Sequence, residues 1–123
     1  MLHNYDTFVK KLSRFHKAFG HPIGKEFSQD DIKLPLTLIE EEFKELIEAS
    51  MKGEVPNIKK ELVDLVYVCV SMCVRYGWDL DVMFNLVHNS NMTKLDEHGN
   101  PIYREDGKIL KSNRYLPVDL TKL

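Results

Sequence analysis

The chain has 123 residues, 43% of them hydrophobic and 29% charged, a composition that is typical of one globular domain and excludes a disordered or collagen-like chain. Seventeen basic and nineteen acidic residues give a formal net charge of −2, so no overall positive field favours a nucleic-acid polymer as partner. The first residues lack the apolar core of a secretory signal, and the apolar stretch from Leu62 to Val74 is shorter than the about 20 residues that span a membrane. We therefore predict a cytoplasmic protein with no membrane partner.

Three helices are predicted in the first part of the chain. Apolar residues recur every three or four positions over residues 2–19, which predicts a first helix that ends at Gly20. After a polar loop, the same periodicity predicts a second helix over about residues 35–53. A third is expected over about residues 56–77, because Pro56 fits the first turn of a helix, where its missing N–H costs nothing.

The last part of the chain changes character after one more helix. Asp79 is a good N-cap for a fourth helix, and from about residue 91 glycines and prolines interrupt a polar, basic segment. We call residues 92–123 the C-terminal arm. Within it, the short apolar segments 101–103 and 108–110 flank an Asp-Gly pair that ends at Gly107, which predicts a short β-hairpin.

These elements predict an all-α fold, an antiparallel four-helix bundle with a C-terminal arm that contains a short β-hairpin. We expect one domain over residues 1–123, with a helical core over about residues 1–91. The third helix has apolar residues on every side, so we expect it to be buried almost all round, together with the thiols of Cys69 and Cys73. A chain this short buries only a modest core, which favours association with copies of itself.

Two consecutive helices each carry two acidic residues three positions apart, Glu42 with Glu45 and Glu61 with Asp64. Residues at this spacing lie on one side of a helix, about 5–6 Å apart. Glu45 and Glu61 lie eight residues before and after Gly53, and Glu42 and Asp64 lie eleven residues before and after it. An antiparallel helical hairpin that turns at Gly53 would therefore bring all four carboxylates together.

A cluster of four carboxylates requires a positive partner. Asp64 lies among apolar residues, where an unpaired charge is costly, and Lys44 and Lys59 are expected on other faces of their helices. A divalent cation is the simplest compensation, and an all-carboxylate set favours Mg²⁺ or Mn²⁺ over zinc. Such sites commonly act on phosphoric anhydrides, and Glu41 is placed to orient or deprotonate a water molecule.

The acidic residues Glu41, Glu42 and Glu45, followed by Glu61 and Asp64, resemble the signature of the all-α nucleoside triphosphate pyrophosphohydrolases, the MazG-like superfamily. Other segments are similar to small stand-alone bacterial and phage members: residues 15–22, 88–95, 101–110 and 115–120. The resemblance implies hydrolysis of a nucleoside or deoxynucleoside triphosphate between the α and β phosphates, giving the monophosphate and pyrophosphate. It also implies four metal ligands (Glu42, Glu45, Glu61 and Asp64), an acid near the water (Glu41), and a homodimer or homotetramer.

Substrate contacts are expected from two regions. Asn91 and Lys94 face one patch, and four residues of the arm are placed to close over the triphosphate or to pack in a dimer: Lys108, Lys111, Arg114 and Tyr115. On the first helix, His16 and Phe19 offer a hydrogen bond and a stacking surface to the base, although aromatic residues at helical spacing are more often part of a core.

The favoured role is cleaning or remodelling of the deoxynucleotide pool, with dUTP or a dGTP-like nucleotide as candidate substrates. The alternative is a non-catalytic helical interaction module with an acidic metal-binding face. A di-metal carboxylate oxidoreductase would need histidine ligands, which neither acidic pair contains.

Overall fold

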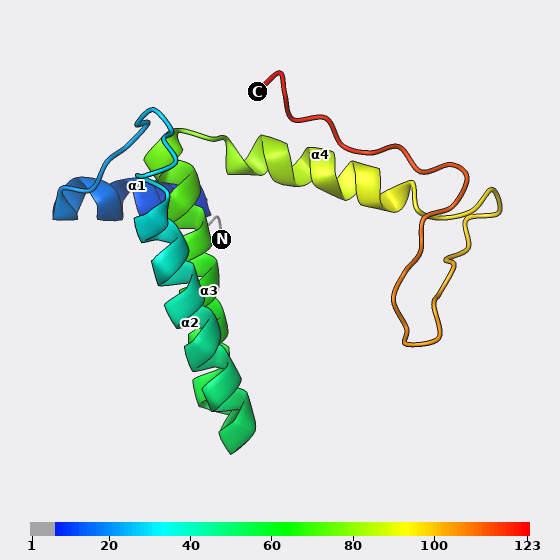
Figure 1. Ribbon diagram of the computed structural model, residues 1–123, viewed down its shortest axis with the longest axis horizontal. Coiled ribbons are helices and arrows are strands. Elements are labelled where there is room, and N and C mark those ends of the chain that lie inside the picture. The colour runs from blue at the N-terminus through cyan, green and yellow to red at the C-terminus, as the bar shows by residue number, and fades with distance from the viewer. Residues whose placement is uncertain (1–6) are drawn as a thin grey trace, which may run out of the picture. The chain divides into compact units, whose positions relative to one another are not determined.

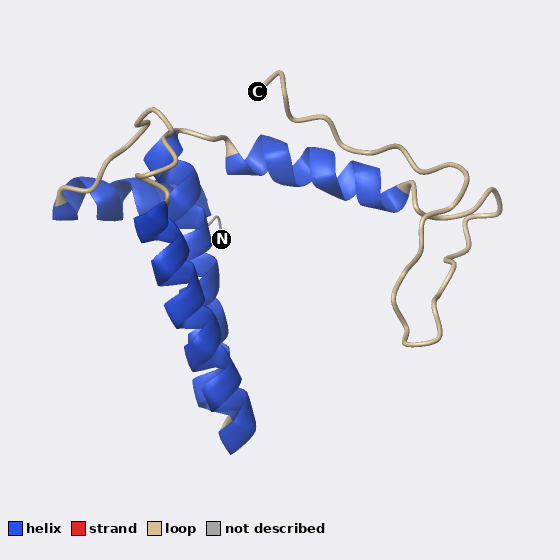
Figure 2. Ribbon diagram, viewed as in Figure 1, coloured by secondary structure: helices blue, strands red, loops and turns tan. Residues whose placement is uncertain are grey.

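The computed structural model describes residues 7–123, so the predicted helical positions Leu2 and Tyr5 lie outside the described residues. The described chain forms four helices, α1 (Phe8–Phe19), α2 (Lys33–Lys52), α3 (Val55–Tyr76) and α4 (Leu80–Met92) (Figure 1). From residue 7 onward the structure contains helices and loops but no strand (Figure 2). The all-α class and the four helices are confirmed.

The chain divides into two compact units, with the boundary between Trp78 and Asp79. In the first unit, α2 and α3 run antiparallel and side by side, and α1 packs against α3 (Figure 1). The turn between α2 and α3 is short because Gly53 adopts a left-handed conformation, with φ of 69°, and its N–H donates to the carbonyls of Ala49 and Ser50. This glycine cap sets the register of the two long helices.

The buried core of the first unit is small; Ala49 of α2 belongs to it, and other members come from α1 and α3. Leu12 of α1 and Val70 and Val74 of α3 are each less than 5% exposed. Within a single chain α3 is not buried all round as expected, since Leu62 and Val63 in its first half are 49% and 61% exposed. Within the first unit, α1 has 12 residues and contacts α3 at Tyr67 and Ser71, in the second half of α3, so it does not extend along the whole of that helix. Cys69, expected as a buried thiol, is likewise exposed.

The loop between α1 and α2 is fastened to the end of α3 by Asp31. Its carboxylate accepts two hydrogen bonds from the guanidinium of Arg75, both 2.7 Å long, and one of 2.7 Å from the hydroxyl of Tyr76. Lys25 adds an ion pair of 2.6 Å, and the Asp31 side chain is only 9% exposed. The Arg75 guanidinium, followed by Lys25 and Tyr76, holds the pKa of Asp31 far below its usual range.

Replacement of Asp31 by asparagine is expected to lower the midpoint of thermal unfolding by several degrees at pH 7, because it leaves the Arg75 guanidinium without its anionic partner. A lowered pKa stabilises the fold above the unfolded aspartate pKa of about 3.9, and this stabilisation is lost as the pH falls through the folded value. Urea unfolding at several pH values measures this pH dependence. The difference in urea midpoint between wild type and D31N should narrow below about pH 4. The control is D30N, since Asp30 is 95% exposed, and an equal loss in both variants would contradict the assignment.

The second unit consists of α4 and the C-terminal arm. The side chain of Asp79 accepts a hydrogen bond of 3.2 Å from the N–H of Val82, which confirms the predicted N-cap. The arm returns along α4 (Figure 1), where the hydroxyl of Ser90 donates to the carbonyl of Leu116 and that of Thr93 accepts from its N–H. These bonds explain how a segment without regular structure is held in a defined path.

The predicted β-hairpin over residues 101–110 is wrong. The chain does reverse at the expected place, where Gly107 has a φ of 89°, but the only pairing there is an isolated antiparallel bridge between Tyr103 and Ile109. Each flanking segment has three residues, and Pro101 has no N–H with which to extend the ladder. A ribbon of two such short segments is too weak to form strands without a third one beside it.

Within the described residues, no helix combines the length and the apolar character needed to cross a membrane.

Candidate metal centre

The α2 and α3 helices bring together three of the four predicted metal ligands. Glu42 and Glu45 of α2 and Glu61 of α3 each offer one carboxylate oxygen, and these oxygens lie within 4.8 Å of one another. The grouping follows from the sequence spacing: the two α2 residues share one side of the helix, and the turn at Gly53 sets Glu45 opposite Glu61. We call these three residues the glutamate cluster.

Two oxygens of the glutamate cluster are buried without a partner. Glu61 is 9% exposed and Glu42 is partly buried, whereas Glu45 is exposed. Oε2 of Glu42 and Oε2 of Glu61 are shielded from solvent and accept no hydrogen bond from the described chain. A buried carboxylate oxygen without a donor is costly, and a bound cation would offset that cost.

Burial raises the pKa of the Glu61 carboxyl above its usual value, and the neighbouring carboxylate of Glu45 raises it further. Lys60 acts in the opposite direction, but its effect is smaller than that of burial. The three oxygens therefore repel one another when ionised. A donor set made only of carboxylate oxygens fits a hard divalent cation such as Mg²⁺ or Mn²⁺.

Asp64 does not join the glutamate cluster in the structure. Its carboxylate lies 2.6 Å from the ammonium of Lys60, which also lies 3.6 Å from the carboxylate of Glu61. The Asp64 side chain is 34% exposed, so the expected deep burial is wrong. The sequence analysis considered Lys44 and Lys59 as partners and missed Lys60, although its position four residues before Asp64 identifies it as a neighbour.

Two other predicted residues of the first helices have different surroundings. Glu41 is exposed on α2, one turn before Glu45 and on the same side of the helix. His16 is only 1% exposed, its Nδ1 lies 2.7 Å from the carbonyl oxygen of Pro22, and its Nε2 lies 2.5 Å from the hydroxyl of Ser71. The expected contact between His16 and a base is therefore wrong, since both ring nitrogens are used inside the protein.

The remaining predicted substrate contacts lie in the second unit, apart from Phe19, which is 66% exposed at the end of α1. Asn91 is exposed on α4 and Lys94 is half-buried just after it. In the arm, Lys108 is exposed, and the ammonium of Lys111 lies 4.8 Å from the ring centroid of Tyr115.

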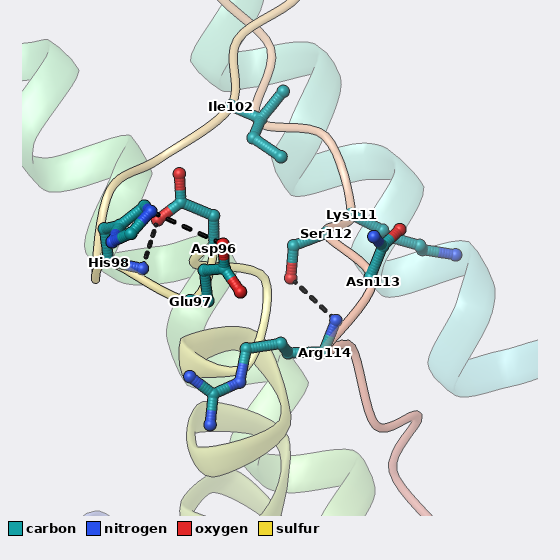
Figure 3. A pocket seen from close by; sticks show the side chains of 8 residues that line it. All are labelled: Asp96, Glu97, His98, Ile102, Lys111, Ser112, Asn113 and Arg114. Carbon is teal, nitrogen blue, oxygen red and sulfur yellow. Dashed lines mark hydrogen bonds and ion pairs between the residues drawn. The ribbon is translucent and has the colours of Figure 1, made fainter.

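A pocket of about 260 Å³ lies within the second unit (Figure 3). Lys111 and Arg114 line it, but so do the acidic residues Asp96 and Glu97. The Asp96 carboxylate accepts hydrogen bonds from the backbone N–H groups of His98 and Asn100, so it is used to shape the loop. The lining of the pocket therefore has mixed charge.

Comparison with known proteins relates the chain to several others. An uncharacterized protein of Acanthamoeba polyphaga mimivirus is 26% identical over 113 residues, which cover 86% of this chain and 43% of the viral protein. The chain thus spans less than half the length of this curated relative. A crystal structure of a proposed NTP pyrophosphohydrolase from Exiguobacterium sp. 255-15 aligns with a TM-score of 0.47 and 23% identity, covering 91% of this chain and 89% of that one.

The phosphoribosyl-ATP pyrophosphohydrolase family matches residues 12–91. The matched region extends from α1 to the end of α4 and includes every acidic residue of the predicted signature. Because it covers well over half of the sequence, the chain belongs to the phosphoribosyl-ATP pyrophosphohydrolase family, within the MazG-like all-α superfamily.

Proposed function

We propose that the chain is a divalent-metal-dependent nucleoside triphosphate pyrophosphohydrolase that cleaves between the α and β phosphates. The observation that carries this proposal is the glutamate cluster, with two buried carboxylate oxygens that have no hydrogen-bond partner. Membership of a pyrophosphohydrolase family supports the same reaction class. The products would be a nucleoside monophosphate and pyrophosphate.

Glu42, Glu45 and Glu61 would hold Mg²⁺ or Mn²⁺, and we keep Asp64 as the fourth proposed ligand because it lies one turn after Glu61 on α3. When bound, the cation supplies charge neutralisation for the phosphates and makes a water molecule more acidic. The cation would also neutralise part of the negative charge of Asp64. The attraction between the Lys60 ammonium and the Asp64 carboxylate would therefore become weaker.

Glu41 is the proposed general base. Its carboxylate is exposed and lies on the side of α2 that carries Glu45, so it is open to a water molecule beside the glutamate cluster. In the proposed reaction one carboxylate oxygen of Glu41 accepts a proton from the water that attacks the phosphate. Phe19 is the proposed surface for the base, and Asn91, Lys94, Lys108, Lys111, Arg114 and Tyr115 stay predictions.

The biological role that we propose is cleaning or remodelling of the deoxynucleotide pool, with dUTP or a dGTP-like nucleotide as substrate. The test is pyrophosphate release from the common ribonucleoside and deoxynucleoside triphosphates and dUTP, each in Mg²⁺, in Mn²⁺ and in EDTA. Metal-dependent formation of the monophosphate is the expected result. Absence of turnover with every nucleotide would contradict the proposal and favour the non-catalytic interaction module.

We also propose that the chain forms a homodimer or homotetramer through the exposed apolar side of the helical hairpin. On α3, Leu62, Val63 and Val66 are between 44% and 61% exposed, and on α2 Phe43 is 52% exposed. Neighbouring apolar side chains of this size on a monomer are typical of an interface.

Replacement of Val63 by glutamate is expected to shift the protein toward the monomer, because the new charge would have to be buried without a partner. Light scattering coupled to size-exclusion chromatography at several concentrations measures the change in mass. The prediction fails if wild type is a monomer throughout, or if V63E assembles as wild type does.

A further inference from the structure

We propose that Lys60 is a built-in counter-cation of the metal-free acidic site, which holds Asp64 and competes with the divalent cation for it. The acidic site here means the glutamate cluster together with Asp64. Because Asp64 must exchange one positive partner for another when the metal binds, Lys60 sets how tightly the site holds that metal. The inference rests on the proposed function, since it takes the cation at the glutamate cluster as given.

Lys60 contacts two of the four proposed metal ligands. Its Nζ lies 2.6 Å from Oδ2 of Asp64 and 3.6 Å from Oε1 of Glu61. The other oxygen of Glu61, Oε2, is shielded from solvent and accepts no hydrogen bond from the described chain, and the same is true of Oε2 of Glu42. Lys60 therefore neutralises Asp64 but leaves the buried oxygens of the glutamate cluster without a positive partner.

Two acidic pairs with the same spacing have different surroundings. Glu42 and Glu45 are three residues apart on α2, and both belong to the glutamate cluster. Glu61 and Asp64 are also three residues apart on α3, but only Glu61 belongs to it. The ammonium of Lys60, together with the shorter side chain of aspartate, accounts for this difference, because it holds the Asp64 carboxylate in an ion pair.

The ion pair between Lys60 and Asp64 is weak enough to be replaced. The two side chains are 64% and 34% exposed, so water screens their attraction. The basic residue also precedes the acidic one, which is the less favourable order for a pair four residues apart on a helix, whereas Glu40 and Lys44 on α2 have the favourable order. A divalent cation carries twice the charge of an ammonium and attracts a carboxylate more strongly.

Removal of the Lys60 charge should therefore have opposite effects on the two states of the site. In the metal-free protein the ammonium offsets part of the negative charge of Asp64 and Glu61, so its loss is unfavourable. During metal binding the same ammonium has to give up Asp64, so its loss is favourable. A substitution that only damaged the fold would weaken metal binding, so tighter binding separates a counter-cation from a structural residue.

The first test compares the affinity of K60M and of the control K44M for Mn²⁺. Lys44 is the matched control because it is 68% exposed, pairs with an acid four residues away, and is adjacent to Glu45 as Lys60 is to Glu61. Titration followed by electron paramagnetic resonance of free Mn²⁺ should give a Kd about fivefold lower in K60M than in wild type, and a change of less than about twofold in K44M. K60R, which keeps the charge, should bind as wild type does. An unchanged Kd in K60M, or the same gain in K44M, overturns the inference.

A double-mutant cycle tests whether Lys60 acts through Asp64. In D64N the ammonium has lost its anionic partner, so adding K60M to this variant should change the Kd for Mn²⁺ by less than about twofold. The same fivefold gain in the presence and absence of Asp64 would show that Lys60 acts only through the overall charge of the site, which overturns the inference.

Thermal unfolding gives a second readout that needs no nucleotide. At the same free Mn²⁺ concentration, the rise in midpoint over the metal-free protein should be about 3 °C larger in K60M than in wild type, and equal in K44M and wild type. Circular dichroism shows whether each variant is folded, and K60Q takes the place of K60M if the latter is not. A rise that is no larger in K60M than in wild type overturns the inference.

These measurements separate the inference from the proposed function. If the affinities follow the predicted pattern but wild type hydrolyses no triphosphate, the proposed function is overturned and the role of Lys60 is supported. If wild type hydrolyses a triphosphate with Mn²⁺ and K60M binds the ion as wild type does, only the inference is overturned. Absence of Mn²⁺ binding in wild type overturns the inference as well.

Discussion

The E61Q variant is expected to lose metal-dependent turnover by about 100-fold or more, because the substitution removes one anionic oxygen from a cluster of three. The same variant should be more stable than wild type at pH 7 when the metal is removed. Burial raises the pKa of Glu61, so the folded state disfavours its ionised form. Loss of activity together with a gain in stability would distinguish a functional carboxylate from a structural one.

The pH dependence follows from the sign of that shift. Below the unfolded glutamate pKa of about 4.3, Glu61 is protonated in both states, so its raised pKa does not affect the stability of the fold. As the pH rises through the folded pKa, Glu61 ionises in the folded protein and stability is lost. The higher midpoint of metal-free E61Q should therefore be seen at pH 7 and disappear near pH 4 in thermal unfolding followed by circular dichroism. The control is E40Q, since the Glu40 side chain is 69% exposed and pairs with Lys44. Equal activity in E61Q and wild type would refute the role of Glu61.

Addition of Mg²⁺ or Mn²⁺ is expected to raise the thermal midpoint of wild type substantially. A free cation concentration of about 100 times Kd stabilises a protein by about 2.7 kcal/mol, which corresponds to a shift on the order of 10 °C for a domain of this size. The physical reason is that the cation replaces the repulsion between the carboxylates of the glutamate cluster by attraction.

The measurement is calorimetry in EDTA and in increasing Mn²⁺, with KCl at matched ionic strength as the control for screening. The double variant E42Q/E61Q should show little shift, because it lacks the two carboxylates whose oxygens are buried without a partner. The same shift in the double variant and in wild type would place the cation elsewhere.

Local rules explain what could be predicted about the glutamate cluster from the sequence. The sequence shows two features directly: acidic residues three positions apart on a helix, and Gly53, which ends α2. Together these features determine which carboxylates meet. The contact between Glu45 and Glu61 therefore required no knowledge of the tertiary structure beyond an antiparallel hairpin.

Features that depend on which surfaces are covered could not be predicted in this way. The bonds of Asp31 to Arg75 and Tyr76 join residues 44 and 45 positions apart, and no periodic pattern relates them. The ion pair of Lys60 with Asp64 has a local spacing, but the partial exposure of Asp64 that accompanies it is not visible in the apolar pattern around this residue. How far α1 extends along α3 is likewise not defined by periodicity alone.

Titration of Mn²⁺ into the metal-free protein, followed by electron paramagnetic resonance of the free ion, tests most directly whether the glutamate cluster is a metal site. Wild type should remove Mn²⁺ from solution, and E40Q should do the same. The triple variant E42Q/E45Q/E61Q, folded by circular dichroism, should leave the Mn²⁺ signal at its full free intensity. Equal binding by the triple variant and wild type would contradict the assignment of the cation to these three glutamates.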